Sequence, residues 1–270
     1  MAERFLYSYL FWLMVISLFV LMLERLVPWR EQKLFRKYLI RDVFFLIFNG
    51  EIFGSCLAVL LYQVAGGLSF SFARIEIFHP LQSLSFPVQV LVFLVCKDFI
   101  EYWIHRLLHR YPLLWYFHGT HHTVSIMDFW CNFRFHWMEI VVYKTLGYAV
   151  PLLLGVPWKV VLISALIATL IGHLNHSNLA FSYGPLRYVL NHPKMHIWHH
   201  EVEPDQGGVK NFGVVFSAWD FLFKTAYIND EKQPKIGLAP PDDLLENKAM
   251  DSLSWSLSAI CVLYYCLFLV

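Results

Sequence analysis

The chain has 270 residues, 58% of them hydrophobic and 15% charged, with a formal net charge of +1. This apolar share exceeds that of ordinary soluble domains, and the nearly balanced charge lacks the basic excess of nucleic-acid-binding proteins. The composition therefore favours a single membrane-embedded unit and excludes nucleic acid as a partner.

Six apolar segments follow one another along the chain, where a helix needs about 17–25 residues to cross a bilayer. They cover about residues 5–23, 43–65, 86–104, 140–154, 159–171 and 253–270. The first has no small-residue cleavage site after it and is interpreted as an uncleaved anchor. Gly155-Val156-Pro157 joins the fourth and fifth, which predicts a membrane hairpin over about residues 140–171. Both arms are short, so partial penetration of the bilayer stays an alternative.

The basic segment at residues 30–41 predicts the orientation, because positive charge in short loops faces the cytoplasm. The third and fifth segments then return to the cytoplasm just before His105 and His173. We expect an all-α integral membrane bundle with a cytoplasmic, histidine-rich helical cap. Residues 1–97 would form N-terminal transmembrane helices, 98–230 a catalytic region containing the hairpin, and 231–270 a surface loop with a C-terminal transmembrane helix.

Twelve of the thirteen histidines lie between His105 and His200. Most form four clusters whose members are three or four residues apart, a spacing that places side chains on one helix face. Neutral imidazole is the commonest metal ligand, and ten imidazoles exceed what one ion can bind. The pattern predicts two metal ions, held by His105, His109, His118, His121, His122, His173, His176, His196, His199 and His200.

The remaining histidines and one acid are interpreted separately. His79 lies apart and is taken as structural, His136 as a supporting or structural residue, and His192 is left out of the ligand set because it precedes Pro193. Asp98 shares a helix face with His105, so we expect it to accept the second ring N–H of that ligand.

The histidine motifs together resemble those of the fatty acid hydroxylase / sterol desaturase superfamily. They are HRLLH, then HGTHH nine residues later, then HLNHSN, and finally MHIWHH followed by Asn-Phe-Gly. The resemblance covers about residues 98–227 and implies a di-iron centre with the ten ligands named above. Its Arg-Phe-His…Glu motif adds Glu139 to Asp98 and His136 as residues around the ligands. The third cluster is HxxH where some members have HxxxH, which leaves open whether His176 or His192 is the tenth ligand.

This family membership implies an oxygenase that hydroxylates or desaturates an unactivated C–H bond of a lipid, either fatty acyl, sterol or related. It would use O₂ and two iron ions, with zinc as a substitute in purified protein. The chain has no cysteine set for an iron–sulfur cluster and no dinucleotide fingerprint, so a separate cytochrome b5-like or ferredoxin-like donor is implied.

Two rival functions stay open. An ether-lipid monooxygenase is a rival within the same family. A non-catalytic metal-binding or transport protein is a rival from another class, but a transporter would place ionisable ligands along a mid-membrane pathway. Here the clusters lie at segment ends. The expected location is the bacterial inner membrane or the endoplasmic reticulum, with the active site facing the cytoplasm.

Overall fold

The computed structural model describes residues 8–54, 56–57, 81–153, 156–202, 208–230 and 232–238, and these ranges contain helices but no β-strand. The expected last span and His79 lie outside them. Two isolated bridges, Pro28 with Leu179 and Glu201 with Ile236, are the β-type pairs of the described part. The all-α prediction is confirmed. The elements are α2 (Tyr9–Leu26), α3 (Leu39–Ile47), η1 (Phe48–Phe53), α5 (Phe86–Arg110), α6 (Pro112–His122), η2 (Phe129–Phe133), α7 (Trp137–Leu153), α8 (Trp158–His176), η3 (Gly184–Tyr188), α9 (Pro193–His196), η4 (Ile197–His200) and α10 (Ala218–Leu222).

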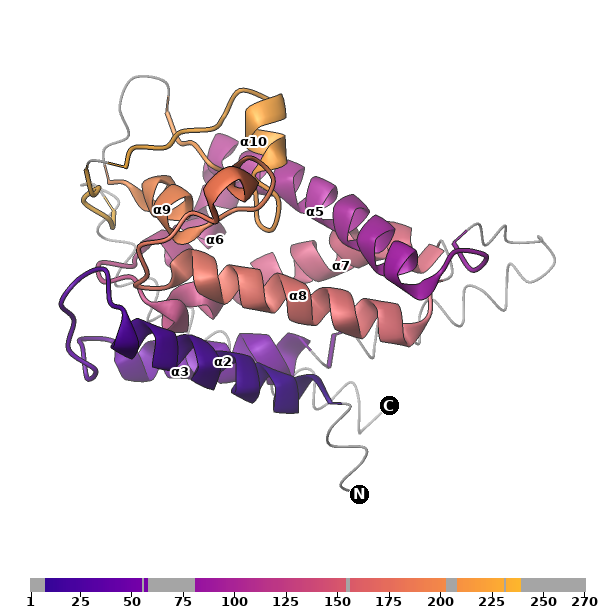
Figure 1. Cartoon of the computed structure of the whole chain (residues 1–270), viewed down its shortest axis with the longest axis horizontal. Coiled ribbons are helices and arrows are strands. Elements are labelled where there is room, and N and C mark those ends of the chain that lie inside the picture. The colour runs from indigo at the N-terminus through magenta and orange to yellow at the C-terminus, as the bar shows by residue number, and fades with distance from the viewer. Residues whose placement is uncertain are drawn as a thin grey trace.

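The long helices form the body of the molecule, and the short ones gather at one end (Figure 1). Helix α8 contacts both α5 and α2, while α5 also contacts α6 and α7. Helices α6, α9 and α10 lie over the ends of α5 and α8 that carry histidines (Figure 1). The fold thus brings segments between Phe86 and Leu222 to one place.

Helices α2 and α8 are long and apolar enough to cross a bilayer. Along α2, Val20 is buried, whereas Leu18, Phe19 and Met22 are about half exposed. Water rarely contacts apolar faces of this extent in soluble monomers. The exposed side of α2 therefore fits a lipid environment.

Several boundaries differ in detail from the sequence prediction. Helix α5 does not stop at residue 104 but continues to Arg110, so it carries the first histidine pair in its last two turns. Pro112 then begins α6, as proline favours the first turn of a helix. The expected hairpin consists of α7 and α8, with Pro157 as the N-cap of α8. The second apolar segment changes from α-helix to a π-helix at Phe48–Phe53.

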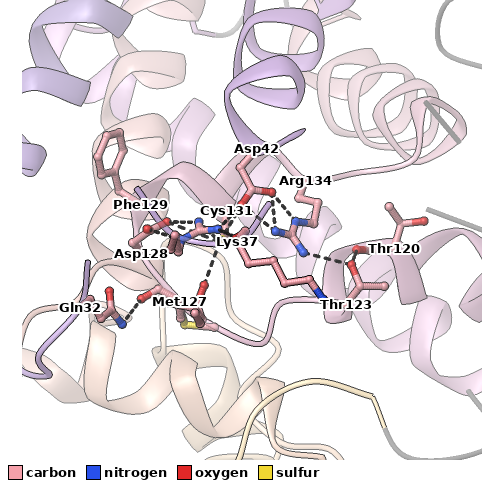
Figure 2. Close-up of polar contacts among 12 residues, drawn as sticks. Gln32, Lys37, Asp42, Thr120, Thr123, Met127, Asp128, Phe129, Cys131 and Arg134 are labelled. Carbon is pink, nitrogen blue, oxygen red and sulfur yellow. Dashed lines mark hydrogen bonds and ion pairs between the residues drawn. The ribbon is translucent and has the colours of Figure 1, made fainter. Parts of the chain in front are cut away.

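A buried ion-pair network fastens the basic segment to the cap (Figure 2). Arg36 donates through Nε and Nη2 to the carboxylate of Asp128 at 2.6 and 2.5 Å. Arg134 donates in the same two-pronged way to Asp42 at 2.5 and 2.6 Å, and its Nη1 donates to Thr123 Oγ1 at 3.1 Å. Because Thr123 follows α6 directly, the network fixes the end of the helix that carries the HxxHH motif.

Candidate metal centre

Eight of the ten predicted ligands form two groups of four. Within each group, one nitrogen atom from every imidazole lies within 4.8 Å of the others. Each group combines residues from three different parts of the chain, so neither exists before the helices pack. The first group is His105, His109, His118 and His199, and the second is His121, His176, His196 and His200.

The spacing between Nε2 atoms fits shared metal ligation. It is 3.1 Å for His105–His118, His109–His199, His121–His176 and His176–His196. A metal–imidazole bond of about 2.0–2.1 Å places two ligands of one ion about 3.0–3.4 Å apart. The all-nitrogen donor set suits iron, zinc, copper and nickel. The residues present therefore fit a pair of transition-metal ions.

Acceptors on the far side of four rings determine which nitrogen faces the centre. The Nδ1 atoms of His105, His176 and His199 donate at 2.8 Å to backbone carbonyls of Phe212, Gly172 and Lys210. His118 Nδ1 donates at 2.8 Å to Glu139 Oε1. A proton held on Nδ1 leaves the Nε2 lone pair free for a metal, and such outer partners orient metal-bound histidine in general.

Burial keeps these imidazoles neutral. It lowers the pKa of His118, His121 and His196 well below the usual value, and neighbouring histidines lower it further. A protonated imidazole cannot bind a metal, so a lowered pKa means that protons compete with the metal only at acidic pH. At neutral pH each ring offers a lone pair.

His122 lies between the two groups without belonging to either. Its Nε2 is 3.2 Å from His118 Nε2 in the first group. Its ring centroid is 4.5 Å from that of His200 in the second group. The side chain is placed to bind at the junction of the two groups.

The structure does not bring His173 into either group, which differs from the sequence prediction. Its Nε2 lies 3.0 Å from Ser17 Oγ of α2, and Asn132 donates its amide to the Nδ1 at 2.8 Å. Both ring nitrogens therefore have protein partners. His173 comes one turn before His176 on α8, and its ring turns toward α2 instead of the cap. We propose that its role is structural.

Asp98 also differs from expectation, because it does not bond to His105. It accepts hydrogen bonds from the Val215 and Phe216 amides and from the Trp219 indole, at 2.7, 2.9 and 2.9 Å. Asp98 lies on the predicted face of α5. The backbone at Val215 and Phe216 packs against this face, so its amides occupy the acceptor sites of the carboxylate. Asp98 supports the centre only through that segment.

The last three residues singled out in the sequence differ in their distance from the two groups: Glu139 contacts a grouped histidine, whereas His136 and His192 lie outside both groups. The His136 Nδ1 accepts from the Met138 amide at 3.2 Å, its ring centroid lies 4.9 Å from that of Phe117 in a tilted arrangement, and it belongs to neither group. His192 is buried outside both groups, and its ring nitrogens have no hydrogen-bond partner among the described residues. Glu139 contacts a grouped histidine directly, as given above.

Asp220 is a supporting residue that the histidine pattern does not reveal. Its two carboxylate oxygens accept from the Phe212 and Gly213 amides at 2.8 Å each. This holds the Phe212 carbonyl against His105. A Cβ at position 213 would lie 2.3 Å from the Phe216 carbonyl oxygen, so only glycine fits in this turn. Asp220 lies within the residues 98–227 that carry the family resemblance, but no histidine spacing marks it.

Removing the charge of Glu139 should weaken metal binding without dismantling the site. Glu139→Gln leaves an acceptor for His118 but lowers the basicity of that ligand, and changes to such partners reduce metal affinity about 10–100-fold. Iron affinity measured by competition with a chelator should show a loss in this range. His136→Ala, in the neighbouring turn, is the control and should bind iron normally. Equal affinity of Glu139→Gln and the unmodified protein would remove Glu139 from the centre.

Comparison with known proteins agrees with this geometry. The sequence profile described as fatty acid hydroxylase matches residues 90–225, which is half of the chain and contains every grouped histidine. The chain belongs to the fatty acid hydroxylase family. The resemblance found from the motifs is confirmed.

Three relatives show the range of fatty acid hydroxylase family members that this chain resembles. It is 32% identical to ornithine lipid hydroxylase OlsE of Rhizobium tropici, an alignment that covers 80% of this chain and 65% of the relative. It is 30% identical to alkylglycerol monooxygenase of Homo sapiens, over 50% of this chain and 30% of the relative. It is 26% identical to very-long-chain aldehyde decarbonylase GL1-10 of Oryza sativa subsp. japonica, over 54% of this chain and 49% of the relative. The chain thus spans less than two thirds of the length of each relative. No solved structure matches it.

Proposed function

We propose that this protein is a membrane-bound di-iron oxygenase that hydroxylates an unactivated C–H bond of a lipid, using O₂ and external electrons. The observation that carries the proposal is the pair of four-histidine groups placed side by side. The relation to ornithine lipid hydroxylase supports a lipid substrate. All grouped histidines fall within residues 98–230, which we propose as the catalytic region between the segments at 1–97 and 231–270.

A cavity of about 160 Å³ borders both groups. Its lining is mostly apolar carbon and includes Phe133, Phe135 and Ile140, together with His105 and His121 from the two groups. Typical small-molecule pockets measure roughly 300–1,000 Å³, so this one accommodates only part of a lipid. A C–H bond placed here would face the histidines directly.

The protein's own contribution is to hold the metal ions, to orient their histidine ligands and to shield the site from water. Bound iron would supply the reductive activation of O₂, which no amino-acid side chain provides. The grouped histidines would hold the ions through Nε2, and the Phe212, Gly172 and Lys210 carbonyls keep three of those rings in the required tautomer. Apolar walls limit the access of water, which favours reaction with the lipid over side reactions.

Cleavage of an ether lipid is the second candidate, because the chain also resembles alkylglycerol monooxygenases from several animals. Oxygen inserted beside an ether oxygen gives an unstable product that breaks at that bond, so the two functions differ in product and not in site. Desaturation would remove two hydrogens instead. Metal transport is less well supported because the grouped histidines lie near the C-terminal ends of α5, α6 and α8 and in α9 and η4.

We propose that the cap faces the cytoplasm of a bacterial inner membrane or of the endoplasmic reticulum. Electrons would come from a separate cytochrome b5-like or ferredoxin-like donor. Among the eight grouped histidines, His109 is the one that is partly exposed. Its ring lies 5.1 Å from the partly exposed Trp115, which also contacts His122 at 5.1 Å. We propose that the donor docks at this edge.

Iron content and lipid products test the proposal together. Protein loaded anaerobically with iron should contain two irons per chain, because there are two groups. With O₂ and a reductant it should convert a membrane lipid into a product heavier by one oxygen atom. Two separated fragments from one lipid would indicate ether cleavage, and the loss of two hydrogens would indicate desaturation. A single iron at saturation would contradict the di-iron proposal.

A further inference from the structure

A basic and apolar segment, residues 25–41, begins at the end of α2. It contains six basic residues and one acid, Glu31. The large apolar side chains between them are strongly exposed, namely Leu26 at 74%, Val27 at 61%, Phe35 at 84% and Ile40 at 86%. Cationic and apolar side chains exposed next to each other are typical of segments that lie in the headgroup layer of a membrane, where phosphate and hydrocarbon meet.

The fold places this basic segment between two apolar segments of the chain. Helix α2, whose exposed side fits a lipid environment, ends at Leu26, and α3 begins at Leu39 with the next apolar segment. Residues 27–38 connect the two, and Trp29 lies in this connection with the Arg30 guanidinium 5.4 Å from its ring. Tryptophan is enriched where a membrane meets water, so the connection suits the level at which α2 would leave the bilayer.

An open cavity of about 610 Å³ lies between the basic segment and the loop that follows α6. One wall consists of residues 30–33 and 35–37, and the other of Ser125 and Ile126. Typical ligand pockets measure roughly 300–1,000 Å³, so this cavity has room for a phosphate-bearing group. Lys33 and Ser125 are exposed on opposite walls, and neither forms a hydrogen bond or an ion pair with another described residue. An ammonium and a hydroxyl group are thus available to a ligand between the walls.

The walls of this cavity carry more positive than negative charge. They contain four basic residues and one acid, namely Arg30, Lys33, Arg36, Lys37 and Glu31. Arg36 is neutralised by two aspartates of the buried network described above. Arg30 instead donates to neutral groups, an amide oxygen at 3.2 Å and a backbone carbonyl at 3.3 Å. Arg30 and Lys33 therefore offer positive charge to an anion, and phosphate binds well to both kinds of side chain.

We propose that this cavity binds the headgroup of an anionic phospholipid, while the exposed Phe35 ring lies among acyl chains at its rim. Lys33 and Arg30 would bind the phosphate, and the Ser125 hydroxyl would donate to it from the opposite wall. A zwitterionic headgroup would bring its own ammonium group to the excess positive charge, so an anionic lipid should bind more tightly. The inference goes beyond the proposed oxygenase function and does not depend on the reaction at the two histidine groups.

Binding of such a lipid should stabilise the folded chain. The two walls come from distant parts of the sequence, residues 30–37 and residues 125–126, so the unfolded chain does not offer this site. A ligand that binds only the folded state raises its stability by mass action. Ser125 also follows His122, the last residue of α6, by three positions. The lipid would therefore bind next to the end of the helix that carries the HxxHH motif.

Thermal unfolding of the full chain in a neutral detergent tests the inference. The midpoint Tm is measured with added phosphatidylglycerol, with phosphatidylcholine and with inorganic phosphate. Phosphatidylglycerol at about 100 times its Kd should raise Tm by roughly 5–10 °C, and the other two additions should leave it nearly unchanged. Native mass spectrometry should find a phosphatidylglycerol molecule retained on the chain.

Two variants and a control locate the site. Lys33→Glu reverses a charge of the wall and should lower the affinity for phosphatidylglycerol about 10–30-fold. Phe35→Ser removes the apolar contact at the rim and should lower it about 10-fold. Lys224→Glu is the matched control, since Lys224 is also an exposed lysine but lies after α10, outside this cavity. All three positions are exposed, so Tm without lipid should match that of the unmodified protein.

Equal increases of Tm with phosphatidylglycerol and phosphatidylcholine would overturn the inference. An equal increase with inorganic phosphate would also overturn it, by indicating an anion site that does not need a lipid. Unchanged affinity in both Lys33→Glu and Phe35→Ser, or an equal loss in Lys224→Glu, would have the same meaning. None of these measurements depends on iron or on lipid oxidation, so the oxygenase function is tested separately by its products.

Discussion

Replacing any one of the eight grouped histidines with alanine is expected to abolish lipid oxidation and to release metal. Each imidazole of a group lies within 4.8 Å of the other three, so a vacated position leaves a ligand set that the neighbours cannot close. Elemental analysis and product formation should fall together, from two irons per chain to one or none. His121→Ala and His199→Ala, one from each group, are the most direct tests.

His173→Ala is the control for this series, because it comes from the same histidine motifs but has Ser17 and Asn132 as partners. It should keep both irons and lose some stability, since it leaves the Asn132 amide without its acceptor. His122→Ala should weaken metal binding in both groups, given its position between them. Loss of iron in His173→Ala with full retention in His199→Ala would show that the two groups do not bind the metal.

Removal of the Asp42 carboxylate should cause the largest loss of stability outside the metal centre. Asp42 is fully buried and pairs with both Arg36 and Arg134. Figure 2 shows the pair with Arg134. Asp42→Ala leaves two guanidinium groups with an incomplete set of acceptors in a buried site, and breaking a buried ion pair from one side costs about 3–5 kcal/mol. The free energy of unfolding, measured by denaturant titration in detergent, should fall by this amount.

An exposed ion pair provides the comparison for Asp42. The side chains of Arg187 and Asp230 are 33% and 46% exposed and lie 3.3 Å apart. Pairs of this kind contribute about 0–1 kcal/mol, so Arg187→Ala should unfold almost like the unmodified protein. A similar small effect for Asp42→Ala would mean that the buried network does not hold the basic segment to the cap.

Helical spacing predicted much of the site from sequence. His118, His121 and His122 lie on one α-helix, α6, and the pair at His105 and His109 lies on another, α5. The three- and four-residue offsets therefore correctly predicted helices that carry these histidines. The last cluster departs from a regular helix, since α9 ends at His196 and a 3₁₀-helix carries the next two histidines. Its members divide between the two groups, with His199 in the first and His196 and His200 in the second.

The same spacing could not separate His173 from His176. Whether a ring faces the cap or α2 depends on which helix packs beside α8, and Ser17 is 156 residues away in sequence. The Asp98 prediction differed from the structure for the same reason, because the Val215 and Phe216 amides and the Trp219 indole of α10 take its acceptor sites. Partners such as the Phe212 carbonyl are backbone atoms, which every residue has, so no sequence pattern identifies them.

The order in which the ligands are synthesised has a consequence for metal selection in the cell. His105, His109 and His118 belong to one group, but its fourth member, His199, is made 81 residues after His118. At about 5–20 residues per second, the ribosome exposes this incomplete set for about 4–16 s. Three imidazoles bind zinc and copper more tightly than ferrous iron, following the general affinity order of divalent metals. If the proposed iron centre is to form, α5 and α6 should therefore not pack and bind zinc or copper before His199 is made, which would require that the supply of these free metals is low during translation.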